Sequence, residues 1–143
     1  LTVNDFAGVE LHRNDGHGHF TRAADAFDNP TLFGMSHALG DFNGDGRLDV
    51  FATGMNSTTV RRLNALDLQR PDRAEQTRWR TEMTFGNRLY LGQPNGRFAM
   101  APEAEQVAAA GWAWGVAAFD PENDGDLDLF VANGFISGRT AQD

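Results

Sequence analysis

Two nine-residue stretches, 41–49 and 120–128, follow the same pattern and restrict the folds open to this chain. In both, an oxygen-bearing side chain stands at positions 1, 3, 5 and 9, and glycine stands at position 6. Hard cations such as Ca²⁺ bind six to eight oxygen ligands and accept irregular geometry. Glycine permits the sharp bend that turns alternate side chains toward one centre. Because carboxylates this close repel one another, the pattern indicates a bound cation in each stretch.

The expected ligands are the side chains at positions 1, 3, 5 and 9 and the backbone carbonyl at position 7. In the first loop these residues are Asp41, Asn43, Asp45, Arg47 and Asp49. In the second loop they are Asp120, Glu122, Asp124, Asp126 and Asp128. We therefore expect two Ca²⁺ sites. The alternative is a pair of solvated acidic turns, and two copies in matching sequence context favour the metal.

The residues after each glycine predict strands rather than helices. A helix-flanked Ca²⁺ loop needs a bidentate Glu at position 12, whereas that position holds Ala52 in the first copy and Val131 in the second. Apolar residues alternate instead at 48, 50 and 52 and at 127, 129 and 131. A period of two is typical of a strand, so each loop is expected to join two strands.

Both stretches resemble the Ca²⁺ loops of FG-GAP (VCBS-type) repeats, which occur in integrin-like β-propellers and many secreted bacterial proteins. Residues 87–91, 111–115 and 126–134 resemble the subgroup found beside ASPIC/UnbV-type domains. The resemblance covers most of the chain except residues 57–86. In the second loop Glu122 stands where Asp or Asn is usual, and Pro121 stiffens the turn.

An internal repeat supports an all-β fold. Residues 11–20 align with residues 89–98, just as the two acidic loops align with each other. Each repeat reads as strand, hairpin, strand, linker, apolar strand, loop and apolar strand, which is a four-stranded antiparallel unit such as a β-propeller blade. The predicted fold is a β-propeller segment with one partly helical insertion. The expected divisions are 1–10 (end of a preceding blade), 11–55 (repeat with the first loop), 56–87 (insertion), 88–136 (repeat with the second loop) and 137–143 (start of the next segment).

Residues 1–10 resemble the strand that follows such a loop, so we expect the sequence to be a piece of a longer protein. Two blades leave exposed strand edges that invite pairing, and the resemblance implies closure by about seven blades.

Composition excludes several classes of protein. The net charge is −8, and the eight acids of the two loops equal this whole excess. An acidic chain is a poor partner for nucleic acid, whose phosphates need a basic surface. No apolar run approaches the roughly 20 residues of a membrane span, and without cysteine the chain has no disulfide or thiolate site.

The insertion has a different character from the repeats. Residues 57–68 offer an N-cap serine and helical apolar spacing, and Pro71 is expected to end that helix. Residues 57–88 hold seven Arg against four acids, a net charge of +3. Long insertions on regular scaffolds often carry function, and the equally supported alternative is a helix packed on the scaffold with its arginines paired.

Other chemistry-bearing residues favour structural interpretations. His17 and His19 suit a solvated turn better than a metal pair. Ser36 lies in a Gly-x-Ser sequence that lacks the final glycine of a nucleophile elbow. Phe20, Phe98, Trp112 and Trp114 are expected in the core, with a sugar-binding aromatic floor as the alternative for the two tryptophans.

The predicted function is therefore a Ca²⁺-stabilised, secreted or cell-surface propeller segment that serves binding, adhesion or assembly and is not an enzyme. Such weak sites would stay empty in the calcium-poor cytosol. Two alternatives remain: part of a polysaccharide-active propeller enzyme, or a subunit of a fibre or larger assembly that pairs through open strand edges. The protein or carbohydrate ligand is not identified by the sequence.

Overall fold

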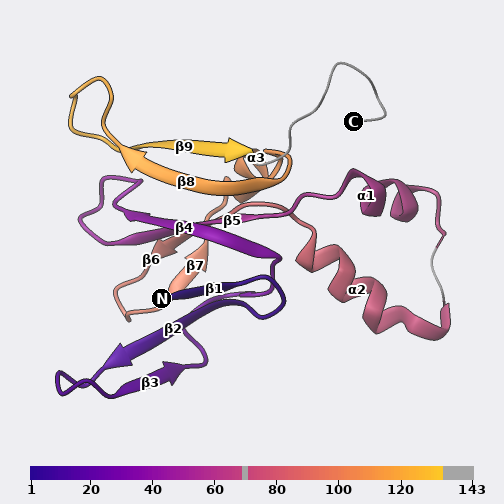
Figure 1. Cartoon of the computed structure of the whole chain (residues 1–143), viewed down its shortest axis with the longest axis horizontal. Helices are drawn as coiled ribbons and strands as arrows, with labels where there is room; N and C mark the ends of the chain where they lie inside the picture. Colours follow the sequence, from indigo (N-terminus) through magenta and orange to yellow (C-terminus); the bar gives the residue numbers. More distant parts are fainter. Residues whose placement is uncertain (69–70, 134–143) are drawn as a thin grey trace.

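The structure, a computed structural model, describes residues 1–68 and 71–133, so the expected segment at 137–143 lies outside the described residues. Nine strands form three antiparallel sheets within the described ranges (Figure 1). The first sheet contains β1 (Thr2–Asn4), β2 (Gly8–Asn14) and β3 (Phe20–Ala23). The second, in the order β4-β5-β6-β7, contains β4 (Gly34–Gly40), β5 (Asp49–Gly54), β6 (Arg88–Gly92) and β7 (Phe98–Met100). The third pairs β8 (Ala113–Phe119) with β9 (Asp128–Asn133).

The prediction of an all-β fold of antiparallel sheets with one partly helical insertion is confirmed, and this architecture is that of a propeller segment without a closed ring. The sheets, however, do not coincide with the sequence repeats. Repeat 11–55 supplies β2 and β3 to one sheet and β4 and β5 to the next. The four-stranded sheet instead spans residues 34–100, so the structural unit is offset from the sequence repeat by two strands.

The core lies where the second sheet meets the segment that precedes it. Every residue of β5 is buried. Phe27, from the connection between β3 and β4, stacks on Phe98 at 4.8 Å between ring centroids and meets Tyr90 edge-on at 5.0 Å. Val9, Leu32 and Val50 belong to the same buried cluster. Phe98 thus packs as predicted, whereas Phe20 is 64% exposed and the expectation of a core position is wrong. Phe20 lies on β3, the outer strand of the first sheet as described.

The insertion separates two strands that lie side by side. Val50 pairs with Tyr90 and Ala52 with Arg88, and between them the chain leaves the sheet as α1 (Thr58–Ala65), the short 3₁₀ helix η1 (Pro71–Arg73) and α2 (Ala74–Met83). Ser57 caps α1 as predicted, since its hydroxyl accepts a hydrogen bond from Val60 N at 3.3 Å. The helix ends before Pro71, at Ala65.

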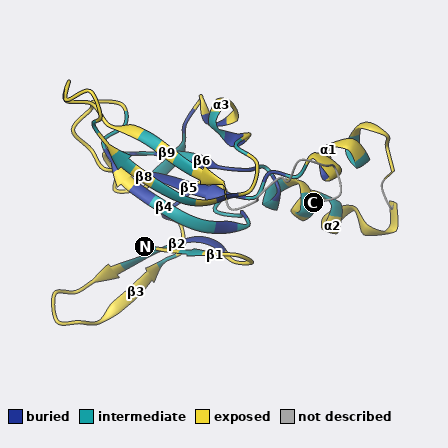
Figure 2. Cartoon of the chain, turned by 45° about the horizontal axis from the view of Figure 1, so that its top comes forward, coloured by how far each residue is buried: buried dark blue, intermediate teal, exposed yellow. Residues whose placement is uncertain are grey.

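The insertion projects from the sheets at the end opposite the acidic loops (Figures 1 and 2). Its surface is mostly exposed: Val60 is the one fully buried residue of α1, and α2 has none. A third helix, α3 (Ala104–Ala108), follows β7 and was not predicted. No helix in residues 1–68 and 71–133 is long and apolar enough to cross a membrane.

Candidate functional site

The first acidic loop connects β4 to β5 and is wrapped around the carboxylate of Asp41. Asp41 Oδ1 accepts a hydrogen bond from Asp45 N at 3.0 Å, and Oδ2 accepts one from Gly46 N at 2.7 Å. This closure requires the left-handed backbone of Gly44 and Gly46, with φ of 72° and 80°. The glycine at position 6 therefore has the role that the sequence predicts for it.

Arg47 brings a positive charge into this loop. Its Nη2 lies 2.6 Å from Asp45 Oδ2, and its Nε donates to the carbonyl of Gly92 at 2.9 Å. Partial desolvation raises the pKa of Asp45, but hydrogen bonds from Asn43 and the Arg47 backbone, with the Arg47 charge, outweigh it and hold that pKa below its ordinary value. A guanidinium has no acceptor atom and cannot bind a cation, so the expected metal ligand at this position is the Arg47 carbonyl.

Asp49, the last residue of the first loop, is fully buried at 0% exposure. Its Oδ2 accepts a hydrogen bond from Phe42 N at 3.0 Å, and its Oδ1 accepts one from Gly92 N at 2.8 Å. The first bond closes the loop on itself, and the second joins it to β6. A carboxylate can be buried when such donors replace its water, so Asp49 fastens the loop to the sheet without a metal.

The second loop, between β8 and β9, repeats the same wrap. Asp120 Oδ1 accepts from Asp124 N at 3.1 Å and Oδ2 from Gly125 N at 2.8 Å. The bond from Gly125, with those from Asp124 and Asn123, holds the pKa of Asp120 below its ordinary value. The unusual residues at positions 2 and 3 of this loop leave the wrap intact.

The later half of the second loop differs from that of the first. Asp126 replaces the arginine, and its carboxyl group lies beside that of Asp124. A hydrogen bond and charge repulsion between the two raise the pKa of Asp126, while the same hydrogen bond lowers the pKa of Asp124. Asp128, unlike Asp49, is exposed, because the described β8–β9 sheet has no third strand in the place of β6.

The donor set of both loops fits a hard cation, because it consists of carboxylate, amide and carbonyl oxygens in tight, mainly exposed turns. The two loops are also neighbours in space. Gly40, which ends β4 directly before the first loop, lies so close to Leu127 of the second loop that a Cβ added at Gly40 would be 2.7 Å from Leu127 Cδ1. Within the described ranges, however, no three Asp, Glu or His side chains converge as a preformed metal cluster. In the first loop Asp45 turns toward Arg47 instead, so metal binding would require these side chains to reorient.

The other singled-out residues lie apart from both loops. His17 and His19 are exposed, and their backbone N–H groups donate to Asp15 Oδ1 at 2.7 and 3.2 Å. Ser36 N donates to Thr53 Oγ1 at 2.9 Å within the second sheet. Burial lowers the pKa of the neighbouring His37.

The expectation that the tryptophans belong to the core is wrong. Trp112 and Trp114 are 46% and 51% exposed, and they line a largely apolar cavity of about 320 Å³ that also involves Phe6, Phe33 and Met35. The alternation of large and small residues is observed, but it is the small residue between the tryptophans, Ala113, that is buried, at 1% exposure.

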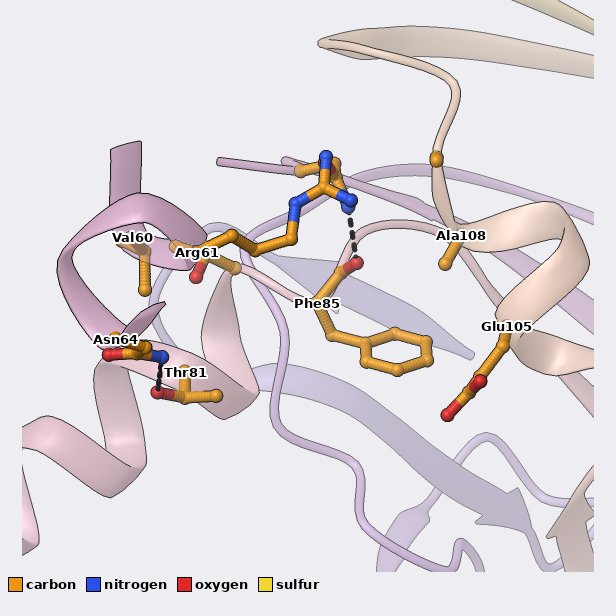
Figure 3. A pocket seen from close by; sticks show the side chains of 10 residues that line it. Val60, Arg61, Asn64, Thr81, Phe85, Glu105 and Ala108 are labelled. Carbon is orange, nitrogen blue, oxygen red and sulfur yellow. Dashed lines mark hydrogen bonds between the residues drawn. The ribbon is translucent and has the colours of Figure 1, made fainter. Parts of the chain in front are cut away.

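Sequence reasoning missed a second cavity, of about 350 Å³, where the insertion meets α3 (Figure 3). It depends on α3 folding back beside β6 and on Gly86. The φ of Gly86 is 115°, and a Cβ there would collide with the carbonyl of Ala108. A glycine two residues before the strand that begins at Arg88 was the one available signal of this close approach.

The chain was compared with known families, curated proteins and solved structures. No curated protein and no solved structure matched it. The FG-GAP-like repeat family matches residues 1–52 and 79–131, which include both acidic loops and exclude most of the insertion. The finer VCBS-type and ASPIC/UnbV-associated assignment stays a prediction. Because the match extends over most of the sequence and the sheets agree with it, the chain belongs to the FG-GAP-like repeat family.

Proposed function

We propose that this chain is a Ca²⁺-stabilised segment of an extracellular β-propeller that acts as a non-catalytic module for binding, adhesion or assembly. The observation that carries the metal part of the proposal is the shared wrap of the two loops. In each, both oxygens of the first Asp accept hydrogen bonds from the backbone N–H groups at positions 5 and 6. Two loops separated by the insertion thus adopt one backbone geometry.

In the first loop the ion would be held by the side chains of Asp41, Asn43, Asp45 and Asp49 and the carbonyl of Arg47. In the second it would be held by the side chains of Asp120, Glu122, Asp124 and Asp128 and the carbonyl of Asp126. The bound ion supplies positive charge that offsets the repulsion of these carboxylates. The chain positions the oxygens, and the loop backbone orients the first Asp by hydrogen bonding.

The proposed location follows from the strength expected of such sites. Exposed loops without a preformed cage belong with extracellular modules, whose Ca²⁺ dissociation constants are about 10⁻⁴–10⁻³ M. At about 1 mM free Ca²⁺ and a dissociation constant of about 0.1 mM, each site adds about 1.4 kcal/mol to the free energy of unfolding. That is a useful fraction of a total of about 5–15 kcal/mol.

The test is thermal unfolding and calorimetry of the chain in millimolar Ca²⁺ and in EGTA. We expect two ions per chain and a lower melting temperature in EGTA. Asp45→Ala and Asp124→Ala should each remove one ion from the stoichiometry, and Asp25→Ala, an exposed acid outside the loops, should remove none. A melting temperature unchanged by EGTA would contradict the metal proposal. A substrate screen at fixed Ca²⁺ that found turnover of a polysaccharide would contradict the non-catalytic part.

A further inference from the structure

The cavity between the insertion and α3 lies at the end of the sheets opposite the acidic loops. Figure 3 shows Val60, Arg61 and Asn64 of α1 on one side and Glu105 and Ala108 of α3 on the other. Its volume of about 350 Å³ is that of a small-molecule pocket. Val60, Phe85 and Ala108 give it an apolar floor, and charged side chains stand on its two walls.

One wall presents a cation with unused hydrogen-bond donors. Asn56 Nδ2 donates to the carbonyl of Phe85 at 2.7 Å, which turns Asn56 Oδ1 toward Arg61. Arg61 Nη2 donates to that oxygen at 2.8 Å. This bond holds the guanidinium at the cavity. Its other N–H groups have no partner in the described part of the chain, and a guanidinium offers a planar fork of donors suited to a carboxylate.

The α1–α2 side of the cavity is fixed by a short chain of hydrogen bonds. The hydroxyl of Thr81 donates to the carbonyl of Thr77 at 3.0 Å. Since its proton is used there, Thr81 Oγ1 accepts from Asn64 Nδ2, also at 3.0 Å. The helices that carry Arg61 and Thr81 are thereby tied together, so the cation stands on a defined wall.

The opposite wall presents an anion. Glu105 lies in the first turn of α3 and is exposed, and its carboxylate forms no hydrogen bond or ion pair with any described residue. Arg61 and Glu105 therefore line one cavity without pairing with each other. An unpaired cation and an unpaired carboxylate across an apolar floor are complementary to a molecule that carries both charges.

We propose that this cavity binds a small zwitterion of the free amino acid class, with its carboxylate on Arg61, its ammonium group toward Glu105 and its apolar side chain on Val60 and Phe85. A ligand with a carboxylate alone would be repelled by Glu105, and one with an amine alone by Arg61. The site does not involve the acidic loops, so it stands independently of the metal proposal.

The probe is L-leucine, titrated against the full chain in millimolar Ca²⁺ up to about 10 mM and followed by NMR chemical shifts, because millimolar ligand populates even a weak site. N-acetyl-leucine lacks the cation and leucinamide lacks the carboxylate. Each should bind about tenfold or more weakly than leucine, the usual loss when one charge-assisted hydrogen bond is removed. This comparison uses the unaltered chain, so it does not depend on the folding of a variant.

Arg61→Gln and Glu105→Gln should each weaken leucine binding by about tenfold or more. The matched controls are Arg62→Gln, in α1, and Glu103→Gln, at the N-cap of α3, which alter neighbouring exposed charges outside this cavity. They should change the affinity less than about twofold. Absence of leucine binding, equal binding of the acetylated or amidated compound, or wild-type affinity in Arg61→Gln or Glu105→Gln would each overturn the proposal.

Discussion

Replacing Asp49 with alanine separates the structural role of the first loop from any role of a metal. In EGTA the wild-type carboxylate still accepts hydrogen bonds from Phe42 N and Gly92 N, at 3.0 and 2.8 Å. Alanine removes both acceptors and leaves the two N–H groups without these partners at a fully buried position. The loop then loses both its own closure and its attachment to β6.

The magnitude follows from these two bonds. A hydrogen bond to a charged group contributes about 1.5–3 kcal/mol, and part of that sum is returned because a buried carboxylate no longer needs to be desolvated. We therefore expect Asp49→Ala to lower the free energy of unfolding by about 2–4 kcal/mol. Asp128→Ala, at the equivalent but exposed position, should change it by no more than about 0.5 kcal/mol.

The assay is urea unfolding in EGTA at neutral pH, followed by circular dichroism. Asp49→Asn serves as an intermediate variant, since its amide keeps one acceptor oxygen and loses the charge. The expected order of stability is wild type, Asp49→Asn, Asp49→Ala. A loss below about 1 kcal/mol in Asp49→Ala, or an equal loss in Asp128→Ala, would refute the argument from burial and hydrogen bonding.

Two further predictions concern the interior. Arg88 is 1% exposed, donates to the carbonyls of Thr31 and Glu82, both at 2.8 Å, and covers the Phe85 ring. Arg88→Ala should therefore lower the free energy of unfolding, measured in urea, by about 3–5 kcal/mol. The exposed control Arg97→Ala should lower it by no more than about 0.5 kcal/mol. Burial raises the pKa of Tyr90 to about 12. The folded state therefore keeps this proton after the unfolded state has lost it, and stability should fall as pH rises from about 10 toward 12. Tyr90→Phe should flatten that part of the alkaline unfolding profile, and an unchanged slope would contradict the assignment.

The elements that the sequence predicted well are those fixed by local pattern. The period of two after each acidic loop predicted β5 and β9, and Ser57 predicted the start of α1. Pairing between elements was not local. The connection from β3 to β4 does not form a hairpin. It places Phe27 in the core between two sheets, and the strands before and after it therefore belong to different sheets although they are consecutive in one sequence repeat. No feature of the repeat alone specifies that boundary.

The same distinction applies to the site. The wrap around Asp41 and Asp120 depends on residues within the loop, and the sequence predicted the bend at Gly46 and Gly125. The burial of Asp49 depends on Gly92, which is contributed by β6 after the whole insertion. The pairing of β5 with β6 is what makes two equivalent aspartates unequal, and it was visible only in the sheet topology.

On the metal proposal, we also expect the two loops to differ in how much they depend on an added cation. Residues 41–49 hold three acids and Arg47, a net charge of −2, whereas residues 120–128 hold five acids and no base, a net charge of −5. Arg47 lies on Asp45 at 2.6 Å and already supplies some of the positive charge that a metal would bring. At the equivalent place Asp126 adds repulsion, which raises its own pKa beside Asp124. The hydrogen bond from Gly92 N to Asp49 also attaches the first loop to β6. The first loop therefore has protein contacts that reduce its charge repulsion and hold it in place. The second loop lacks both contacts among the described residues, so, on the metal proposal, we expect its order to depend more strongly on a bound cation.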